Sequence, residues 1–155
     1  MFKKILLALL IVFVIIQLIR PAENISSAAM PRAITAVYPV SDSVQTILKK
    51  ACYDCHSDNT RYPWYVNIQP VAWWMNDHVM QGRSHLNFSQ FGTYKKTKQA
   101  RKLGQVAKSV TEGWMPIGSY TWIHKDAILS KNESAAVATW ANGLAAQIGK
   151  DTLSK

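Results

Sequence analysis

Five consecutive residues carry the clearest chemical signal in the sequence: Cys52, Tyr53, Asp54, Cys55 and His56. Two thiols three positions apart can add to the two vinyl groups of one porphyrin, and the adjacent histidine can bind its iron. This C-x-x-C-H spacing predicts one covalently attached c-type haem, with His56 as the proximal iron ligand. The chain has no other cysteine.

Other uses of the same pattern remain open at this point. A structural zinc site needs four ligands, and His78, His85 or His124 would have to complete the set. A redox dithiol is expected at the start of a helix in a βαβ context, and no strand pattern precedes Cys52. A disulfide across two intervening residues would be strained. Haem attachment is the reading that the sequence favours.

The candidates for the sixth iron ligand are Met115 and the three remaining histidines. Met115 belongs to Gly113-Trp114-Met115-Pro116, a predicted loop after a helix. A thioether ligand stabilises ferrous haem and raises its potential, which suits an electron carrier. We therefore predict Met115 as the distal ligand, with a core methionine as the alternative. His78 and His85 are about 10 Å apart along one helix, so they cannot both bind one iron.

Neighbouring residues are predicted to support the haem. Arg61, five residues after His56, is a candidate partner for a haem propionate through paired hydrogen bonds, and a surface arginine is the alternative. A carbonyl near Pro63 or Pro70 is expected to hold the second ring nitrogen of His56. Aromatic side chains that could wall the porphyrin or belong to an ordinary core are Tyr62, Trp64, Tyr65, Trp73 and Trp74.

The elements that position these residues are predicted to be helices. Apolar residues recur at helical spacing, and no segment shows the alternation of apolar and polar residues that is typical of a strand. The first helix begins after Ser41 and carries apolar residues to Ala51, just before the motif. Three more follow. The helix after Pro70 carries Val71, Trp74, Met75 and His78 on one face and weakens at Gly82. The next stops at Gly113, and the last begins with the capping box Ser130–Glu133. Long loops are expected at about 56–70, 84–97 and 113–129. The predicted fold is an all-α, cytochrome c-like domain with long loops around one haem.

The N-terminus is predicted to be a membrane segment. Lys3 and Lys4 precede an apolar run from Ile5 to Ile19 in which only Gln17 is polar. Residues 1–21 therefore suit a signal anchor or a signal peptide, although the run is short for a span. Residues 22–40 are predicted to be a tether, and residues 41–155 the haem-binding domain. The domain is expected on the periplasmic side of the cytoplasmic membrane.

Charge narrows the classes of partner. The formal net charge is +9, and about +6 remains after the three positive charges of the N-terminal segment are set aside. A basic run suits an acidic redox partner or anionic lipid, with a solvated helix face as the alternative. No binding motif accompanies it, so we do not expect nucleic acid. The run consists of Lys95, Lys96, Lys98, Arg101, Lys102 and Lys108.

Two longer stretches resemble a known family, the bacterial haem-binding domain proteins with one c-type haem motif. Residues 52–91, CYDCHSDNTRYPWYVNIQPVAWWMNDHVMQGRSHLNFSQF, are similar to its haem segment, and residues 112–130, EGWMPIGSYTWIHKDAILS, to its Met-Pro segment. The resemblance implies haem at Cys52 and Cys55, His56 as proximal ligand and Met115 as distal ligand. Many relatives read Met-Pro-Pro, whereas Ile117 follows here.

These observations predict an electron carrier rather than an enzyme. A haem enzyme or gas sensor with an open sixth position, such as a small peroxidase, is the alternative. The sequence has no evident acid–base pair beside the motif to support that alternative. A structural or assembly subunit is a third possibility.

Overall fold

The structure, a computed structural model, describes residues 1–153 and is all-α. The predicted domain end at residue 155 lies outside the described residues. Within that range the only β-type pairing is an isolated bridge between Ile25 and Asn59. The α-helices are α1 Phe2–Ile16, α2 Ile34–Val37, α3 Asp42–Ala51, α4 Tyr53–His56, α5 Val71–His85, α6 Lys96–Thr111, α7 Gly118–Thr121 and α8 Lys131–Leu153. The 3₁₀ helices are η1 Trp64–Asn67, η2 Phe88–Thr93 and η3 Lys125–Ala127.

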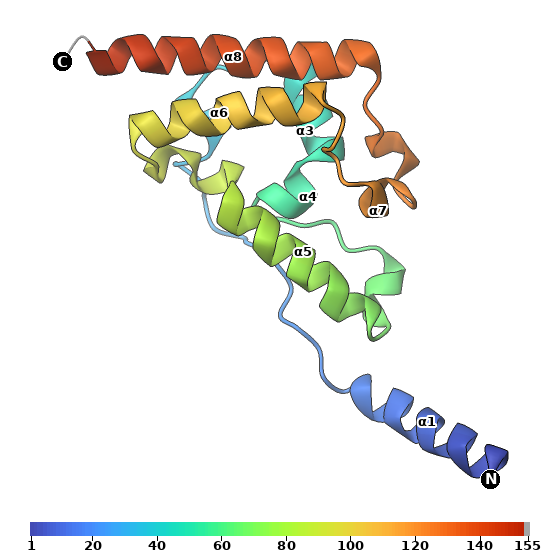
Figure 1. The fold of residues 1–155 in the computed structure, drawn as a ribbon. Helices are drawn as coiled ribbons and strands as arrows, with labels where there is room; N and C mark the ends of the chain where they lie inside the picture. Colours follow the sequence, from blue (N-terminus) through green and yellow to red (C-terminus); the bar gives the residue numbers. More distant parts are fainter. Residues whose placement is uncertain (154–155) are drawn as a thin grey trace.

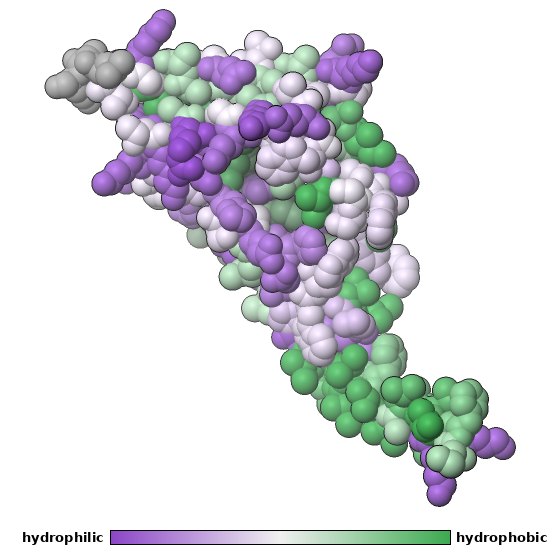
Figure 2. Space-filling model, in the orientation of Figure 1, coloured by the Kyte–Doolittle hydropathy of each residue, from purple (hydrophilic) through white to green (hydrophobic). Residues whose placement is uncertain are grey.

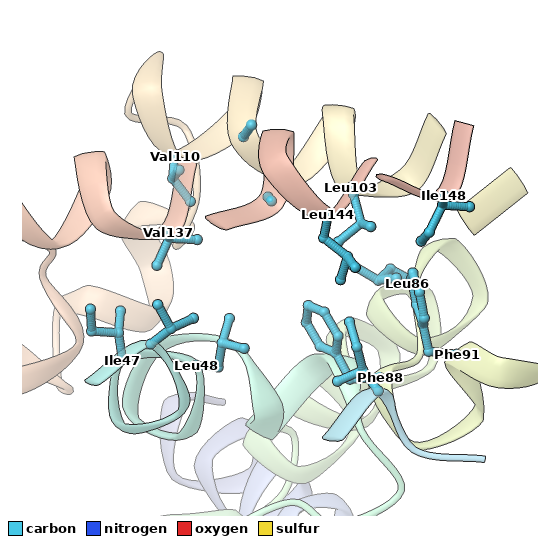
Figure 3. Close-up of a cluster of buried hydrophobic side chains, with 14 residues drawn as sticks. Ile47, Leu48, Leu86, Phe88, Phe91, Leu103, Val110, Val137, Leu144 and Ile148 are labelled. Carbon is cyan, nitrogen blue, oxygen red and sulfur yellow. The ribbon is translucent and has the colours of Figure 1, made fainter. Parts of the chain in front are cut away.

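The core lies between two long antiparallel helices, α6 and α8, and the helix α3 beneath them (Figure 1). Each helix buries a stripe of apolar residues at helical spacing, and these stripes meet in one cluster. Figure 3 shows how the cluster continues downward into η2. Its labelled members are Ile47, Leu48, Leu86, Phe88, Phe91, Leu103, Val110, Val137, Leu144 and Ile148.

The predicted helix ends are present. Ser41 accepts a hydrogen bond from the amide of Val44 and so caps α3. Ser130 and Glu133 form the predicted capping box of α8: each side chain accepts from the other's backbone amide. Gly113 follows α6 with a φ of 75°, the left-handed conformation that favours glycine after a helix.

Helix α5 departs from the expectation in two ways. It continues through Gly82 to His85 rather than weakening there. Its buried residues are Ala72 and Val79, whereas Trp74, on the face that the sequence pattern selected, is exposed. The predicted loops are also more ordered than expected, because η1, η2, α7 and η3 lie within them.

The N-terminal residues form a short apolar helix followed by a segment that packs on the domain. Helix α1 has 15 residues, and no helix among residues 1–153 is both long and apolar enough to cross a membrane. The segment predicted as a tether packs on the domain: Ile34 is buried in the core, and the Asn24 side chain donates to Ser57 and Thr60. Residues 22–40 are therefore part of the folded unit rather than a free linker.

Candidate functional site

A large cavity lies between the haem-type motif, the C-terminal half of α5, the underside of α6 and the segment after α6. Its volume is about 690 Å³, within the ~300–1,000 Å³ range typical of cofactor sites. Four predicted site residues line it together: Cys52, Cys55, His56 and Met115. Figure 2 shows a hollow with apolar residues inside and hydrophilic residues around it.

The two cysteines sit at the junction of α3 and α4. Cys52 ends α3, and its carbonyl accepts the amides of Cys55 and His56, which closes the single turn of α4. One turn therefore brings both thiols and the imidazole to the same cavity. Burial, with a smaller effect of Cys55, raises the pKa of Cys52 to about 12. Burial, with a smaller effect of Asp54, raises the pKa of Cys55 to about 11.

The protonated thiols bear on the alternatives to haem. Cysteines that bind zinc or act as redox dithiols do so as thiolates. Sites of these kinds favour the thiolate because they lower the cysteine pKa. Burial raises the pKa of both thiols and so favours their protonated form when no metal is bound. Both are free cysteines, and across residues 1–153 no group of three or more His, Cys, Asp or Glu side chains is arranged to hold a metal ion. The geometry thus gives no support to a zinc site or a disulfide.

The imidazole of His56 is fixed by the end of α5. Its Nδ1 lies 2.9 Å from the carbonyl oxygen of Gly82 and 3.0 Å from that of Leu86. Carbonyls only accept, so Nδ1 carries the hydrogen and Nε2 keeps its lone pair for a metal. Burial lowers the pKa of His56 despite these two hydrogen bonds, which favours the neutral ring that a metal ligand needs.

These carbonyls correct the expectation that Pro63 or Pro70 would hold His56. The Gly82 carbonyl also accepts the amide of Leu86, the residue after α5, and a carbonyl oxygen has a second lone pair that can accept from His56. Gly82 also allows α5 to approach the motif closely. A Cβ at Gly82 would lie 2.5 Å from the carbonyl oxygen of Cys55, closer than such atoms can approach.

Asp54, between the two cysteines, is buried and organises one side of the site. It accepts hydrogen bonds from the backbone and guanidinium of Arg61 and from the hydroxyl of Tyr120, at 2.6 to 3.2 Å. Arg61 therefore pairs with a protein carboxylate and does not line the large cavity. The expectation that Arg61 holds a haem propionate has no support in this arrangement. Lys102 and Lys108 line the cavity instead.

Asp58 organises the other side, just after His56. Its carboxylate accepts hydrogen bonds from Arg83 of α5 and from Asn87 and Gln90 around η2, at 2.7 to 3.2 Å. Burial alone would raise the pKa of Asp58, but these three partners together lower it. Asp58 thus ties the motif to the same end of α5 that holds the His56 ring.

Met115 reaches the cavity from the segment after α6. Its amide donates to the carbonyl of Ser109 at 3.4 Å, a long hydrogen bond, and its side chain is half-buried. The segment is attached farther along by Tyr120, whose hydroxyl donates to Asp54. The contact between residues 54 and 120 therefore attaches the segment that carries Met115 to the motif.

The remaining histidines lie in different surroundings. His78 and His85 line the large cavity from α5. His78 uses Nδ1 to donate to the carbonyl of Trp74. His124 lines only a second cavity of about 50 Å³, where its Nε2 bonds to the Tyr65 hydroxyl at 2.8 Å and its ring stacks on Tyr120. His124 is therefore committed to packing.

The aromatic residues expected to wall the porphyrin are elsewhere. None of the five lines the large cavity; Tyr65 and Trp74 face the small one, and Trp64 is exposed. Trp114 is the tryptophan that lines the large cavity.

The sequence analysis missed Asp54, Asp58, Gly82 and Tyr120. One signal for the carboxylates was available: the chain has nine acidic residues, and two of them flank His56 at close range. Buried carboxylates need partners, so each implied an arginine or a hydroxyl nearby. No comparable signal marks Gly82 or Tyr120.

The donor set fits a haem: two protonated thiols, a neutral imidazole with a free lone pair and a thioether face one cavity of suitable size. No curated protein and no solved structure matches the chain significantly. A family model, described as haem-binding domain, matches residues 11–143. Because this match covers most of the chain, the protein belongs to the haem-binding domain family.

Proposed function

We propose that the protein is an exported electron carrier with one covalently attached c-type haem. The observation that carries the proposal is the single cavity that brings Cys52, Cys55, His56 and Met115 together. The proposal includes export to the periplasmic side of the membrane and attachment there through the apolar N-terminal segment.

Each residue has a distinct role in this proposal. The thiols of Cys52 and Cys55 add across the two vinyl groups: each sulfur bonds one vinyl carbon and the hydrogen passes to the other, so no oxidant is consumed. His56 supplies Nε2 to the iron, and Met115 supplies its thioether sulfur. When bound, the haem supplies one-electron exchange between ferric and ferrous iron.

A basic rim beside the cavity supports docking of an acidic redox partner. Lys102 and Lys108 of α6 line the cavity, and they belong to the longer basic run that begins at Lys95. Burial, together with the nearby charges of Arg101 and Lys98, lowers the pKa of Lys102. Complementary charge raises the rate of encounter more than the affinity, so electron transfer should slow as salt is added.

The substitution Met115→Ala tests the ligand assignment. A Met-ligated low-spin ferric haem has a weak far-red absorption band, and we expect this band to vanish while the covalent haem remains. The reduction potential should fall, because the thioether stabilises the ferrous state. Met80→Ala is the matched control, since Met80 is an exposed methionine of α5 outside the cavity.

The opposite outcome favours a different class of protein. An unchanged far-red band in Met115→Ala would exclude Met115 as ligand. High-spin haem with rapid carbon monoxide binding in the unsubstituted protein would favour a haem enzyme or gas sensor with an open sixth position.

A further inference from the structure

Three exposed tryptophans that do not line the haem cavity lie close together in the sequence, at one corner of the molecule. This aromatic corner consists of η1 and the first turn of α5, with Trp64, Ile68, Trp73 and Trp74 exposed. Trp64 is the most exposed of them, at 76%. No charged residue occurs in the sequence between Arg61 and Asp77, so the segment that forms the corner carries no charge of its own. A contiguous surface of this kind marks an interaction site.

The corner is joined to the end of α1 by side-chain hydrogen bonds. Gln17, the one polar residue in the apolar run, accepts from the amide of Gln69 at 2.9 Å and donates to its carbonyl. The side chains of Gln69 and Trp73 both donate to the carbonyl of Ile19, at 2.8 and 2.9 Å. Gln69 is fully buried in this junction. The junction therefore fixes the aromatic corner against the end of α1.

After Lys3 and Lys4, helix α1 is apolar on every side, and it buries no residue against the domain. Its 15 residues measure about 22 Å at ~1.5 Å per residue, against ~30 Å for a bilayer core. Leu18 and Ile19 extend the apolar surface beyond the helix, and the aromatic corner follows directly. Figure 2 shows apolar surface along α1 and at the lower margin of the domain beside it.

We propose that the aromatic corner is a lipid-contact surface that lies in the headgroup region of the bilayer that receives α1. Tryptophan favours this region because its ring is apolar and its N–H can hydrogen-bond. Arg20 donates to Asn67 at the end of η1 and so adds a positive charge to the corner, where anionic lipid headgroups would lie. The proposal rests on the membrane attachment stated under Proposed function.

This placement orients the haem cavity. Helix α5 begins at the corner, and Gly82, whose carbonyl holds His56, lies 11 residues after Val71. At ~1.5 Å per residue this is up to about 16 Å from the lipid-contact surface. The corner therefore holds the domain with its cavity beyond the lipid surface, as Figure 1 shows for the course of α5.

Hydroxyl-radical footprinting of the full-length holoprotein in vesicles of phosphatidylethanolamine and phosphatidylglycerol tests the proposal. Oxidation of each tryptophan is read by mass spectrometry on the protein that floats with the vesicles. The internal control is Trp114, which lies at the cavity and is 54% exposed. Exposure in the structure alone predicts faster oxidation of Trp64 than of Trp114; lipid contact reverses this order.

The possible outcomes separate the lipid-contact surface from the membrane attachment. Floated protein in which Trp64 is oxidised faster than Trp114 overturns the lipid-contact surface and leaves the attachment intact. Protein that does not float overturns both, while its haem spectrum reports separately on the proposed electron carrier. Protection of Trp64 that grows with the protein-to-lipid ratio would assign the corner to a second copy and overturn the proposal.

A variant tests the junction. Gln17→Leu keeps α1 apolar and removes both hydrogen bonds to Gln69. We expect unchanged flotation and faster oxidation of Trp64, because the corner is no longer fixed against α1. Unchanged protection in this variant would contradict the role of the junction.

Discussion

Two parts of the cavity lining are built differently. The His56 wall consists of the motif and the end of α5, and the Met115 wall consists of residues 111–120. On the His56 wall, two backbone carbonyls hold the ring, and the buried Asp58 ties the motif to the same end of α5. On the Met115 wall, none of residues 111–120 is buried. The backbone of Met115 is attached to α6 by one long hydrogen bond, from its amide to the carbonyl of Ser109. The firmer attachment of that wall is the distant contact of Tyr120 with Asp54.

The difference indicates a fixed proximal ligand and an adjustable distal one. Positions held by packed backbone resist substitution, because the backbone cannot shift without moving a whole helix. A segment held by one side-chain hydrogen bond can open locally at a low free-energy cost. Substitutions on the His56 wall should therefore affect global stability and haem retention, and those on the Met115 wall should affect ligand exchange.

The largest expected effect is that of Gly82→Ala. The new Cβ would lie 2.5 Å from the carbonyl oxygen of Cys55, so α5 must move away from the motif and from His56. We expect a loss of about 3 kcal/mol or more in the free energy of unfolding, with impaired haem retention. Denaturant unfolding and the haem content of purified protein measure both.

Gly104→Ala is the matched control, since a Cβ there meets nothing within 4 Å. Alanine in the interior of α6 should stabilise the protein by roughly 0.5–1 kcal/mol. Equal behaviour of the two variants would contradict the close approach of α5 to the motif.

Asp58→Ala should have the next largest effect on the His56 wall. It leaves Arg83, Asn87 and Gln90 without their common acceptor. Losing a buried carboxylate with three donors should cost about 2–3 kcal/mol. Thermal unfolding of the holoprotein measures this loss, and the Met-ligation band should persist in the folded protein. Loss of the band without loss of stability would reverse the contrast between the walls.

Tyr120→Phe should act on the Met115 wall alone. It removes the 2.6 Å hydrogen bond to Asp54 and leaves the ring. If the free energy that holds the segment closed falls by about 1 kcal/mol, added imidazole should displace Met115 roughly fivefold faster. Stopped-flow absorbance of the ferric protein measures this rate. Tyr62→Phe is the control, because the Tyr62 hydroxyl bonds to Asn24 away from the cavity; an equal effect would refute the assignment.

The smallest expected effect is that of Glu133→Gln, because Glu133 lies away from both walls. Glutamine keeps the capping box, and the ion pair with Lys50 is lost. The hydrogen bond from Lys50, followed by that from the Ser130 amide, lowers the pKa of Glu133. The ion pair therefore stabilises the protein fully above the ordinary glutamate pKa of about 4.3. This stabilisation is lost as pH falls through the lower pKa that Glu133 has in the folded protein.

We expect the variant to be less stable by about 0.5 kcal/mol near neutral pH, and equal to the parent in strong acid. Thermal unfolding across this pH range measures the difference. A changed haem spectrum would show that this site is not independent of the walls.

The fold was predictable where local chemistry fixes it. Ser41, Gly113 and the pair Ser130–Glu133 mark helix ends because caps act within a few residues. The spacing from Cys52 to His56 was equally local. The tether was mispredicted because its prolines exclude a long helix but do not exclude packing of Ile34 into the core.

The rest of the site depends on contacts that leave no local pattern. The acceptors for His56 are backbone carbonyls, which every residue carries, so only the approach of α5 selects Gly82 and Leu86. Tyr120 meets Asp54 across 66 residues, and Arg61 donates to the same carboxylate.

The account depends most directly on covalent attachment of haem at Cys52 and Cys55. Denaturing extraction of the purified holoprotein with acidified acetone, followed by a pyridine haemochrome spectrum of both fractions, measures it. We predict that the haem stays with the protein, with an α band at the shorter wavelength of a haem whose two vinyl groups are saturated. Haem that extracts completely, or purified protein without haem, would contradict the central claim.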